Sequence, residues 1–161
     1  MFLLKNFKYL LARNSLSICA IGKKTTIGSS DLSKINRGIC NEMNLCLQTV
    51  IKISSMFGIS LHDFVFKDLE KNCNGGNEEY GPMDRSIYLR KNTVYLSEKR
   101  KITLSSLSLK IGCSINTLNR LKRGESKESN MPIRTVAGLA FYFNLTLDEL
   151  VFEDLSKKDK K

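Results

Sequence analysis

The segment that decides the fold is residues 103–124, TLSSLSLKIGCSINTLNRLKRG. Apolar residues recur in it at helical spacing, and Thr103 and Ser114 each stand where the N-cap of a helix is expected. Gly112 suits the left-handed conformation that a tight turn between two helices requires. Gly124 marks the expected end of the second helix. The segment therefore predicts two short helices joined by a tight turn.

Helical patterns continue beyond this segment. Pro132 sits where the first turn of a helix tolerates proline, and Thr146 with Glu149 has the spacing of a capping box that opens a further short helix. At the other end of the chain, residues 1–11 predict an amphipathic helix, because Lys5 and Lys8 interrupt a run that is otherwise apolar. The helix after Pro132 is expected to turn one apolar stripe to the core: Ile133, Val136, Ala137, Ala140 and Phe143.

The chain repeats itself. Shifting the sequence by 86 positions aligns residues 6–71 with 92–157 without a gap, and eighteen positions are then identical. The first copy departs from the second at the turn, where Thr26 replaces Gly112. A β-branched residue there is expected to strain or loosen the turn. If the two copies bind a ligand such as DNA, the first copy is therefore expected to bind it more weakly.

Composition narrows the classes of function. The formal net charge is +10 over 161 residues, and a field of this sign attracts polyanions such as nucleic acid. The five cysteines are Cys19, Cys40, Cys46, Cys73 and Cys113, and they form no CxxC pair. The sequence therefore predicts reduced thiols, without a disulfide framework, a metal site or a cofactor. No nucleophile with a positioned base and no nucleotide-binding motif is present, so the protein is not expected to be an enzyme.

Residues 107–124, LSLKIGCSINTLNRLKRG, resemble the helix-turn-helix core of the Cro/repressor (Xre-like) family, and residues 21–38, IGKKTTIGSSDLSKINRG, are similar. Ser108 and Gly22 occupy the small-residue position of the family pattern, and Cys113 and Ile27 occupy its apolar turn position. The resemblance implies an all-α fold of two tandem five-helix, lambda-repressor-like DNA-binding domains. The expected boundaries are 1–71 for the first domain, 72–86 for a linker, 87–157 for the second domain and 158–161 for a basic tail.

The resemblance also implies which residues meet DNA. Asn116 suits adenine, Arg120 suits guanine, and Ile115 or Thr117 suits a thymine methyl group in the major groove. The remaining contacts of the second copy are expected nearer the phosphates, as is Arg37 in the first copy. The full set of predicted DNA-binding residues is Thr103, Ile115, Asn116, Thr117, Asn119, Arg120, Lys122, Arg123, Ser29, Ser30, Asp31, Lys34 and Arg37.

The leading hypothesis is a sequence-specific regulator of transcription, expected to repress, that binds double-stranded DNA in the cytoplasm at the nucleoid and has no membrane partner. The alternative is an antitoxin or inhibitor that binds a protein target on the same scaffold and also regulates its own promoter. RNA binding ranks third, because the chain lacks the aromatic sheet platform that single-strand readers use. The repeated pairs Val65-Phe66 and Val151-Phe152 leave three alternatives: pairing of the two copies within one chain, which is favoured, a homodimer of two chains, or completion of the core of each copy.

Overall fold

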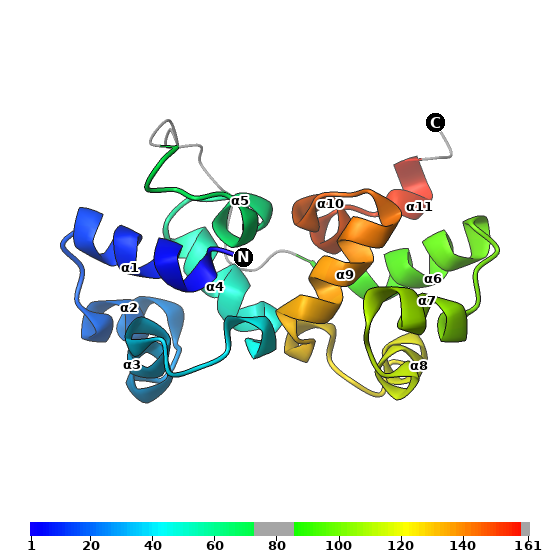
Figure 1. The fold of residues 1–161 in the computed structure, drawn as a ribbon, viewed down its shortest axis with the longest axis horizontal. Helices are drawn as coiled ribbons and strands as arrows, with labels where there is room; N and C mark the ends of the chain where they lie inside the picture. The colour runs from blue at the N-terminus through cyan, green and yellow to red at the C-terminus, as the bar shows by residue number, and fades with distance from the viewer. Residues whose placement is uncertain (73–85, 159–161) are drawn as a thin grey trace. The chain divides into compact units, whose positions relative to one another are not determined.

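A computed structural model of the protein describes residues 1–72 and 86–158. These residues form helices and no strand, which confirms the predicted all-α class (Figure 1). The chain divides into two compact units, Met1–Asp84 and Arg85–Lys161. Most of the linker predicted at 72–86 and residues 159–161 of the predicted tail lie outside the described residues. None of the described helices is long and apolar enough to cross a membrane.

The first unit contains five α-helices and one short 3-10 helix within its described residues. Their order is α1 (Leu3–Arg13), α2 (Ile18–Thr25), α3 (Ser29–Arg37), η1 (Glu42–Asn44), α4 (Leu47–Met56) and α5 (Leu61–Phe66). Helix α1 confirms the amphipathic helix predicted at the N-terminus, because its buried residues include Leu3, Phe7 and Leu10.

The second unit repeats this order and adds one helix. It contains α6 (Leu89–Lys99), α7 (Leu104–Ile111), α8 (Ile115–Arg123), η2 (Glu128–Asn130), α9 (Ile133–Phe143), α10 (Leu147–Phe152) and α11 (Leu155–Lys158). The prediction of five helices missed α11, a single turn whose first residue, Leu155, is buried. Lys158, the first residue of the predicted basic tail, ends this helix and pairs with Glu153.

The two units keep the same register. Helix α3 begins at Ser29 and α8 at Ile115, which is the offset of 86 positions found in the sequence. Backbone conformations follow the same rule, because Ser15 and Lys101 both have a positive φ, of 49° and 50°. The duplication seen in the sequence is therefore also a duplication of local structure.

The helix ends follow the predicted caps. The Thr103 hydroxyl accepts a hydrogen bond from Ser106 N at 3.2 Å, and the Ser114 hydroxyl accepts one from Asn116 N at 3.3 Å. Thr146 and Glu149 form the complete capping box at the start of α10. Each cap satisfies a backbone N–H that the first turn of a helix leaves without an intrahelical acceptor.

Each unit has its own apolar core. All five residues of the stripe predicted for α9 are buried, with exposed fractions of 0–7%. Val65 and Val151 are fully buried, whereas Phe66 is 36% exposed. Both valines therefore complete the core of their own unit, and dimerisation through the two Val-Phe pairs stays a prediction that can rest only on the phenylalanines.

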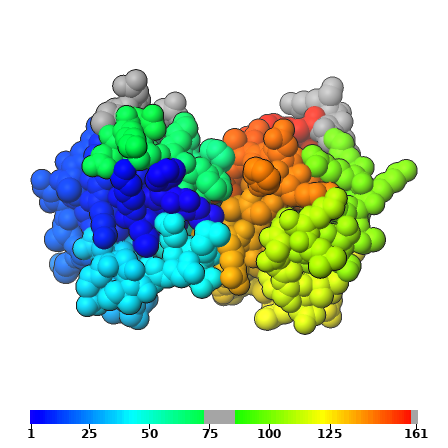
Figure 2. Space-filling view, in the orientation of Figure 1, coloured from blue at the N-terminus to red at the C-terminus, as the bar shows by residue number. Residues whose placement is uncertain are grey.

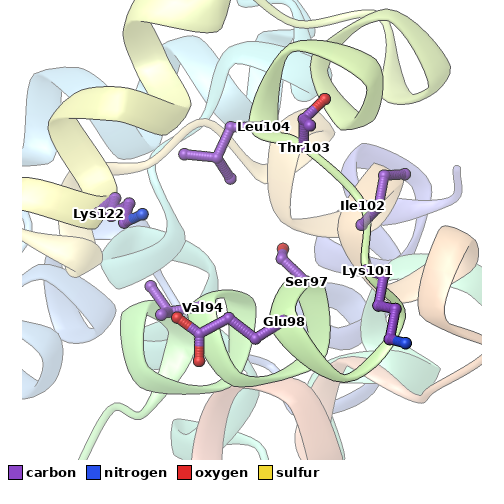
Figure 3. A pocket seen from close by; sticks show the side chains of 8 residues that line it. All are labelled: Val94, Ser97, Glu98, Lys101, Ile102, Thr103, Leu104 and Lys122. Carbon is purple, nitrogen blue, oxygen red and sulfur yellow. The ribbon is translucent and has the colours of Figure 1, made fainter.

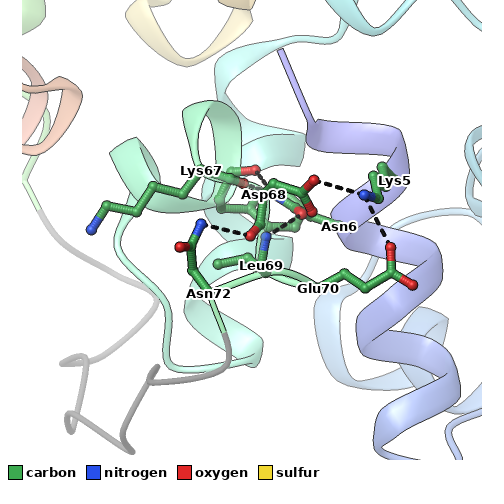
Figure 4. A network of polar contacts seen from close by, with 8 residues as sticks. Lys5, Asn6, Lys67, Asp68, Leu69, Glu70 and Asn72 are labelled. Carbon is green, nitrogen blue, oxygen red and sulfur yellow. Dashed lines mark hydrogen bonds and ion pairs between the residues drawn. The ribbon is translucent and has the colours of Figure 1, made fainter.

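A network of hydrogen bonds and ion pairs connects α1 to the residues at the C-terminal end of the first unit (Figure 4). Asn6 donates to the carbonyl oxygens of Phe64 and Lys67 at 2.8 and 2.7 Å, and its own oxygen accepts from Leu69 N at 3.1 Å. Lys5 Nζ lies 2.7 Å from Asp68 Oδ2, and this hydrogen bond holds the pKa of the Asp68 carboxyl below its ordinary value. Asn6 is fully buried, so its three bonds are required to offset its desolvation.

The second unit contains the same network. Asn92 donates to the carbonyl oxygens of Leu150 and Glu153 at 2.8 and 2.7 Å and accepts from Leu155 N at 3.1 Å. The Lys91–Asp154 ion pair, also 2.7 Å long, repeats Lys5–Asp68. These contacts explain why asparagine and aspartate are identical between the copies at these positions.

A glutamate that is identical in both copies caps the first helix of each unit from a distance. Glu42 Oε2 accepts from Leu4 N at 3.2 Å, and Glu128 Oε2 accepts from Arg90 N at 2.8 Å. Neither Phe2 nor Tyr88, the residues at the N-cap positions of α1 and α6, provides a side-chain cap. A carboxylate at the N-terminus of a helix also interacts favourably with the positive end of the helix dipole.

Candidate nucleic-acid interface

Helices α7 and α8 of the second unit meet through the turn that the sequence predicts. Gly112 ends α7 with a φ of 66°, in the left-handed region that favours glycine. Ser108 is 4% exposed, and its hydroxyl donates to Ser105 O at 2.7 Å, so the small polar side chain is satisfied within its own helix. Behind α8, Leu118 and Leu121 are each 1% exposed. This burial fixes which face of α8 turns outward.

The outward face of α8 carries the predicted DNA-binding residues of the second unit. Asn116, Arg120, Lys122 and Arg123 are exposed, and Ile115 is 39% exposed. Thr117 and Asn119 are half-buried at the edges of this face. Thr103 is exposed at the start of α7, where its hydroxyl already caps the helix. Atoms of α8 lie at the surface of the second unit, in yellow in Figure 2.

Positive charge gathers on α8. The helix carries Arg120, Lys122 and Arg123 in its last turn, and its first turn has no acidic residue. Arg123 is partly engaged, because it lies 3.2 Å from Glu125 Oε1 and donates to Asn119 O at 3.4 Å. Within residues 1–72 and 86–158, Arg120 has no ion-pair partner. Its guanidinium is therefore available for a ligand from solution.

Helix α3 presents the corresponding face of the first unit, and all five predicted residues on it are exposed: Ser29, Ser30, Asp31, Lys34 and Arg37. Lys34 Nζ lies 3.5 Å from Asp31 Oδ1, so one of the two basic groups of this helix is paired with its one acid. Gly28, at the N-cap position of α3, provides no side-chain cap, unlike Ser114 in the second unit. The first face is thus less basic than that of α8.

The turn before α3 places Thr26 in the strained conformation that was one of the two expected outcomes, and side-chain hydrogen bonds support it. Thr26 does adopt the left-handed conformation, with a φ of 57°, but Lys52 Nζ donates to its hydroxyl at 2.7 Å. Thr25 bridges the same turn, because its hydroxyl donates to Ile21 O at 2.8 Å and accepts from Ile27 N at 3.4 Å. These bonds brace a backbone conformation that is costly for threonine.

Sequence reasoning missed the residues that support this turn. The second unit has Gly138 and Ile111 at the positions of Lys52 and Thr25. A Cβ atom on Gly138 would lie 3.0 Å from Ile111 Cβ, which is tighter than most side-chain contacts, so the glycine in α9 gives room to the larger apolar residue in α7. The alignment of the two copies contained a signal for this support, because Thr25 and Lys52 both differ from their counterparts in the second copy.

A shallow depression of about 370 Å³ lies between α6, α7 and α8 (Figure 3). Thr103 and Lys122, both predicted to lie near phosphates, line it from two sides, and Glu98 of α6 lines it as well. The carboxylate of Glu98 disfavours a phosphate inside the depression. Phosphate contacts of Thr103 and Lys122 are therefore expected at its rim.

Among the described residues, no group of three or more His, Cys, Asp or Glu side chains is placed to hold a metal ion. Cys19, Cys40, Cys46 and Cys113 are free thiols, while Cys73 lies outside the described residues. Burial raises the pKa of the Cys113 thiol at the turn, which disfavours its thiolate form.

Two short helices joined by a glycine turn, with an exposed basic face on the second, have the arrangement of a helix-turn-helix element. Residues 95–152 match the family model of the Cro/C1-type HTH DNA-binding domain, which confirms the resemblance for the second unit. The match does not extend to the first unit. Neither the curated proteins nor the solved structures include a match to the chain.

Proposed function

We propose that the protein is a regulator of transcription that binds double-stranded DNA through helix-turn-helix elements in both units and represses the genes it binds. The observation that carries the proposal is the exposed, basic outward face of α8, within the segment that matches the Cro/C1-type domain. A helix of this size fits the major groove, where base edges present distinguishable donors and acceptors. Binding of this kind would bring the protein to the nucleoid.

The exposed residues of α8 have different roles in this proposal. Asn116 and Arg120 are exposed amide and guanidinium groups suited to adenine and guanine, and Ile115 offers apolar surface to a thymine methyl group. Lys122 and Arg123, near the C-terminal end of α8, supply charge for phosphates. The first unit takes part because α2 and α3 repeat the register of α7 and α8.

Salt dependence of binding tests the proposal. The full-length protein is titrated with duplex and single-stranded DNA at several salt concentrations. Because bound Lys and Arg displace condensed counterions, the logarithm of the duplex affinity is expected to fall with the logarithm of salt by about 0.9 per phosphate contacted. Absence of duplex binding at low salt, or tighter binding to single strands, contradicts the proposal.

One observation favours a protein target as the second candidate function. Leu109 and Phe141 are 82% and 89% exposed, whereas the first unit has Lys23 and Ser55 at the corresponding positions. The first unit shows that the fold does not require apolar residues there. Large exposed apolar side chains commonly mark binding surfaces.

Substitutions that copy the first unit test this second candidate. The variants Leu109→Lys and Phe141→Ser are compared with the wild type in capture experiments from nuclease-treated lysate, and their DNA affinity is measured in parallel. A protein that the wild type retains and the variants lose, with DNA affinity unchanged, supports a protein target. Identical capture by all three proteins contradicts it.

A further inference from the structure

The two outward faces differ at the positions that would read bases, although the framework around them is the same. Leu32 and Leu118 anchor both helices, and both helices end at a glycine with a φ of 71° or 73°. The first turn and the residue one turn later differ throughout. The four pairs are Ser29/Ile115, Ser30/Asn116, Asp31/Thr117 and Lys34/Arg120.

These positions are the ones expected at the base edges, because the N-terminal residues of a recognition helix enter the major groove. In α8 they combine an aliphatic group, an amide and a guanidinium fork. Asn116 and Arg120 are both capable of bidentate contacts, to adenine and guanine respectively. Ile115, 39% exposed, adds an apolar contact that favours thymine.

In α3 the same positions carry different chemistry. Ser29 and Ser30 offer small hydroxyl groups that accept or donate to several bases. Asp31 is an acceptor, and its carboxylate suits the amino group of cytosine. Its partner Lys34 is 3.5 Å away, with 56% and 65% of the two side chains exposed, so the pair is weak enough to open when DNA arrives.

We propose that one chain reads a DNA site composed of two unlike half-sites, with α8 selecting one sequence and α3 another. This inference rests on the proposed function. Identical half-sites suit a protein that presents the same recognition helix twice, as a symmetric dimer does. This chain presents two different recognition helices, so a site built from one repeated half-site leaves α3 or α8 facing the wrong bases.

The expected penalty for the wrong bases is large enough to measure. Each mismatched base pair weakens a specific complex by about 5- to 150-fold. With several reading positions different between α3 and α8, a site with two α8-type halves is expected to bind the wild type at least about 5-fold more weakly than its own composite site.

The experiment is selection of bound sequences from random duplex DNA, performed with the full-length wild type and with a graft variant. The graft gives α3 the reading residues of α8, and all four replaced side chains are exposed, so the fold is expected to persist. Circular dichroism checks this. The graft consists of Ser29→Ile, Ser30→Asn, Asp31→Thr and Lys34→Arg.

The wild type is expected to select two different half-sites. The graft variant is expected to retain one of them and to replace the other with a second copy of the retained sequence. Its affinity for the wild-type site is expected to fall by about 5- to 150-fold. The reverse graft, which gives α8 the residues of α3, is the matched control and is expected to duplicate the other half-site.

Several results overturn the inference. They are selection by the wild type of one sequence repeated twice, selection of a single half-site, or an unchanged selected site in the graft variant. In each of these cases duplex binding itself is retained, so the proposal of a regulator that binds double-stranded DNA survives. A single half-site or an unchanged site in the graft variant removes only the role given to the first unit. Loss of all sequence-dependent duplex binding in the wild type instead contradicts the proposed function.

Discussion

Helices α3 and α8 have the same length, end in the same glycine conformation and bury equivalent apolar residues, yet they expose different chemistry. Helix α8 carries three basic residues and no acid, whereas α3 carries two basic residues and Asp31. Residues that hold each helix in its unit are therefore similar in both copies, while residues that face outward have diverged. The difference separates the requirements of the fold from those of the ligand.

The turns before these two helices have the same backbone conformation but are supported by different residues. Gly112 makes the second turn without strain, and Thr26 makes the first turn with a hydrogen bond from Lys52. The second unit has Gly138 in place of this lysine, and the glycine leaves room for Ile111. Two different pairs of residues thus support one backbone conformation.

The largest effect is expected from the buried asparagines that both units share. Replacing Asn92 with alanine leaves three backbone groups without their partner, at a cost of about 3 kcal/mol to the second unit. Hydrogen exchange on the full-length protein is expected to show lost protection in α6 and α10. Asn6→Ala is the matched variant and is expected to affect α1 and α5 instead. Equal loss in both units from either variant would show that the units do not unfold separately.

A smaller effect, on DNA affinity, is expected to separate α8 from α3. Arg120→Ala removes an exposed guanidinium and is expected to cost about 2 kcal/mol on the preferred site and to relax the choice of one base. Lys34→Ala removes an amine that is already paired with Asp31 and is expected to cost less. Titration of both variants at one salt concentration measures the difference. A larger loss for Lys34→Ala would reverse the assignment of the two helices.

Exchanging the left-handed residues of the two turns, Gly112 and Thr26, is expected to change the stability of the two units by unequal amounts. Gly112→Thr places a β-branched residue at a φ of 66° without the lysine that braces Thr26, so it is expected to destabilise the second unit by about 1–2 kcal/mol. Thr26→Gly relieves strain but loses the bond from Lys52, so its net effect is expected to be smaller. Thermal unfolding of both variants tests this pair, and a harmless Gly112→Thr contradicts the account of the turn.

The smallest effect is expected from replacing the paired carboxylates Asp68 and Asp154. Ion pairs with lysine lower the pKa of both carboxyls in the folded protein, so each stabilises its unit above the ordinary aspartate pKa. This contribution is lost as the pH falls through the lowered pKa. Asp68→Asn and Asp154→Asn are therefore expected to be less stable than the wild type at neutral pH and equal to it in strong acid. Chemical unfolding at a series of pH values measures both, and a gap that persists in strong acid contradicts the role of charge.

Local signals in the sequence were sufficient to predict most of the helices. Thr103, Ser114 and the Thr146–Glu149 box mark helix starts through bonds to residues two or three positions away, so the sequence alone displays both partners. The outward face of α8 was also predictable, because Leu118 and Leu121 define the opposite face. Helix α11 was missed because four residues are too few to show a period.

Contacts between distant residues were not predictable in this way. The repeat flagged Asn6, Glu42 and Asp68 as identical between the copies, but their partners lie 38 to 63 positions away in sequence. The brace of Thr26 was missed for the same reason, because Lys52 is on another helix. Which bases α8 and α3 select depends on the geometry of a DNA complex, and no single chain displays that geometry.

The asparagine network has a consequence for how such a chain arises. Asn92, near the start of the second unit, bonds the backbone of Glu153 and Leu155, so the beginning and the end of this folded unit lie within one side chain of each other. A segment whose two ends already meet can be copied as a cassette, because the copy needs only a short connector and no rearrangement of the parent. Neighbouring ends also make this unit a good candidate for circular permutation, with the old termini joined and a new opening placed in a surface loop.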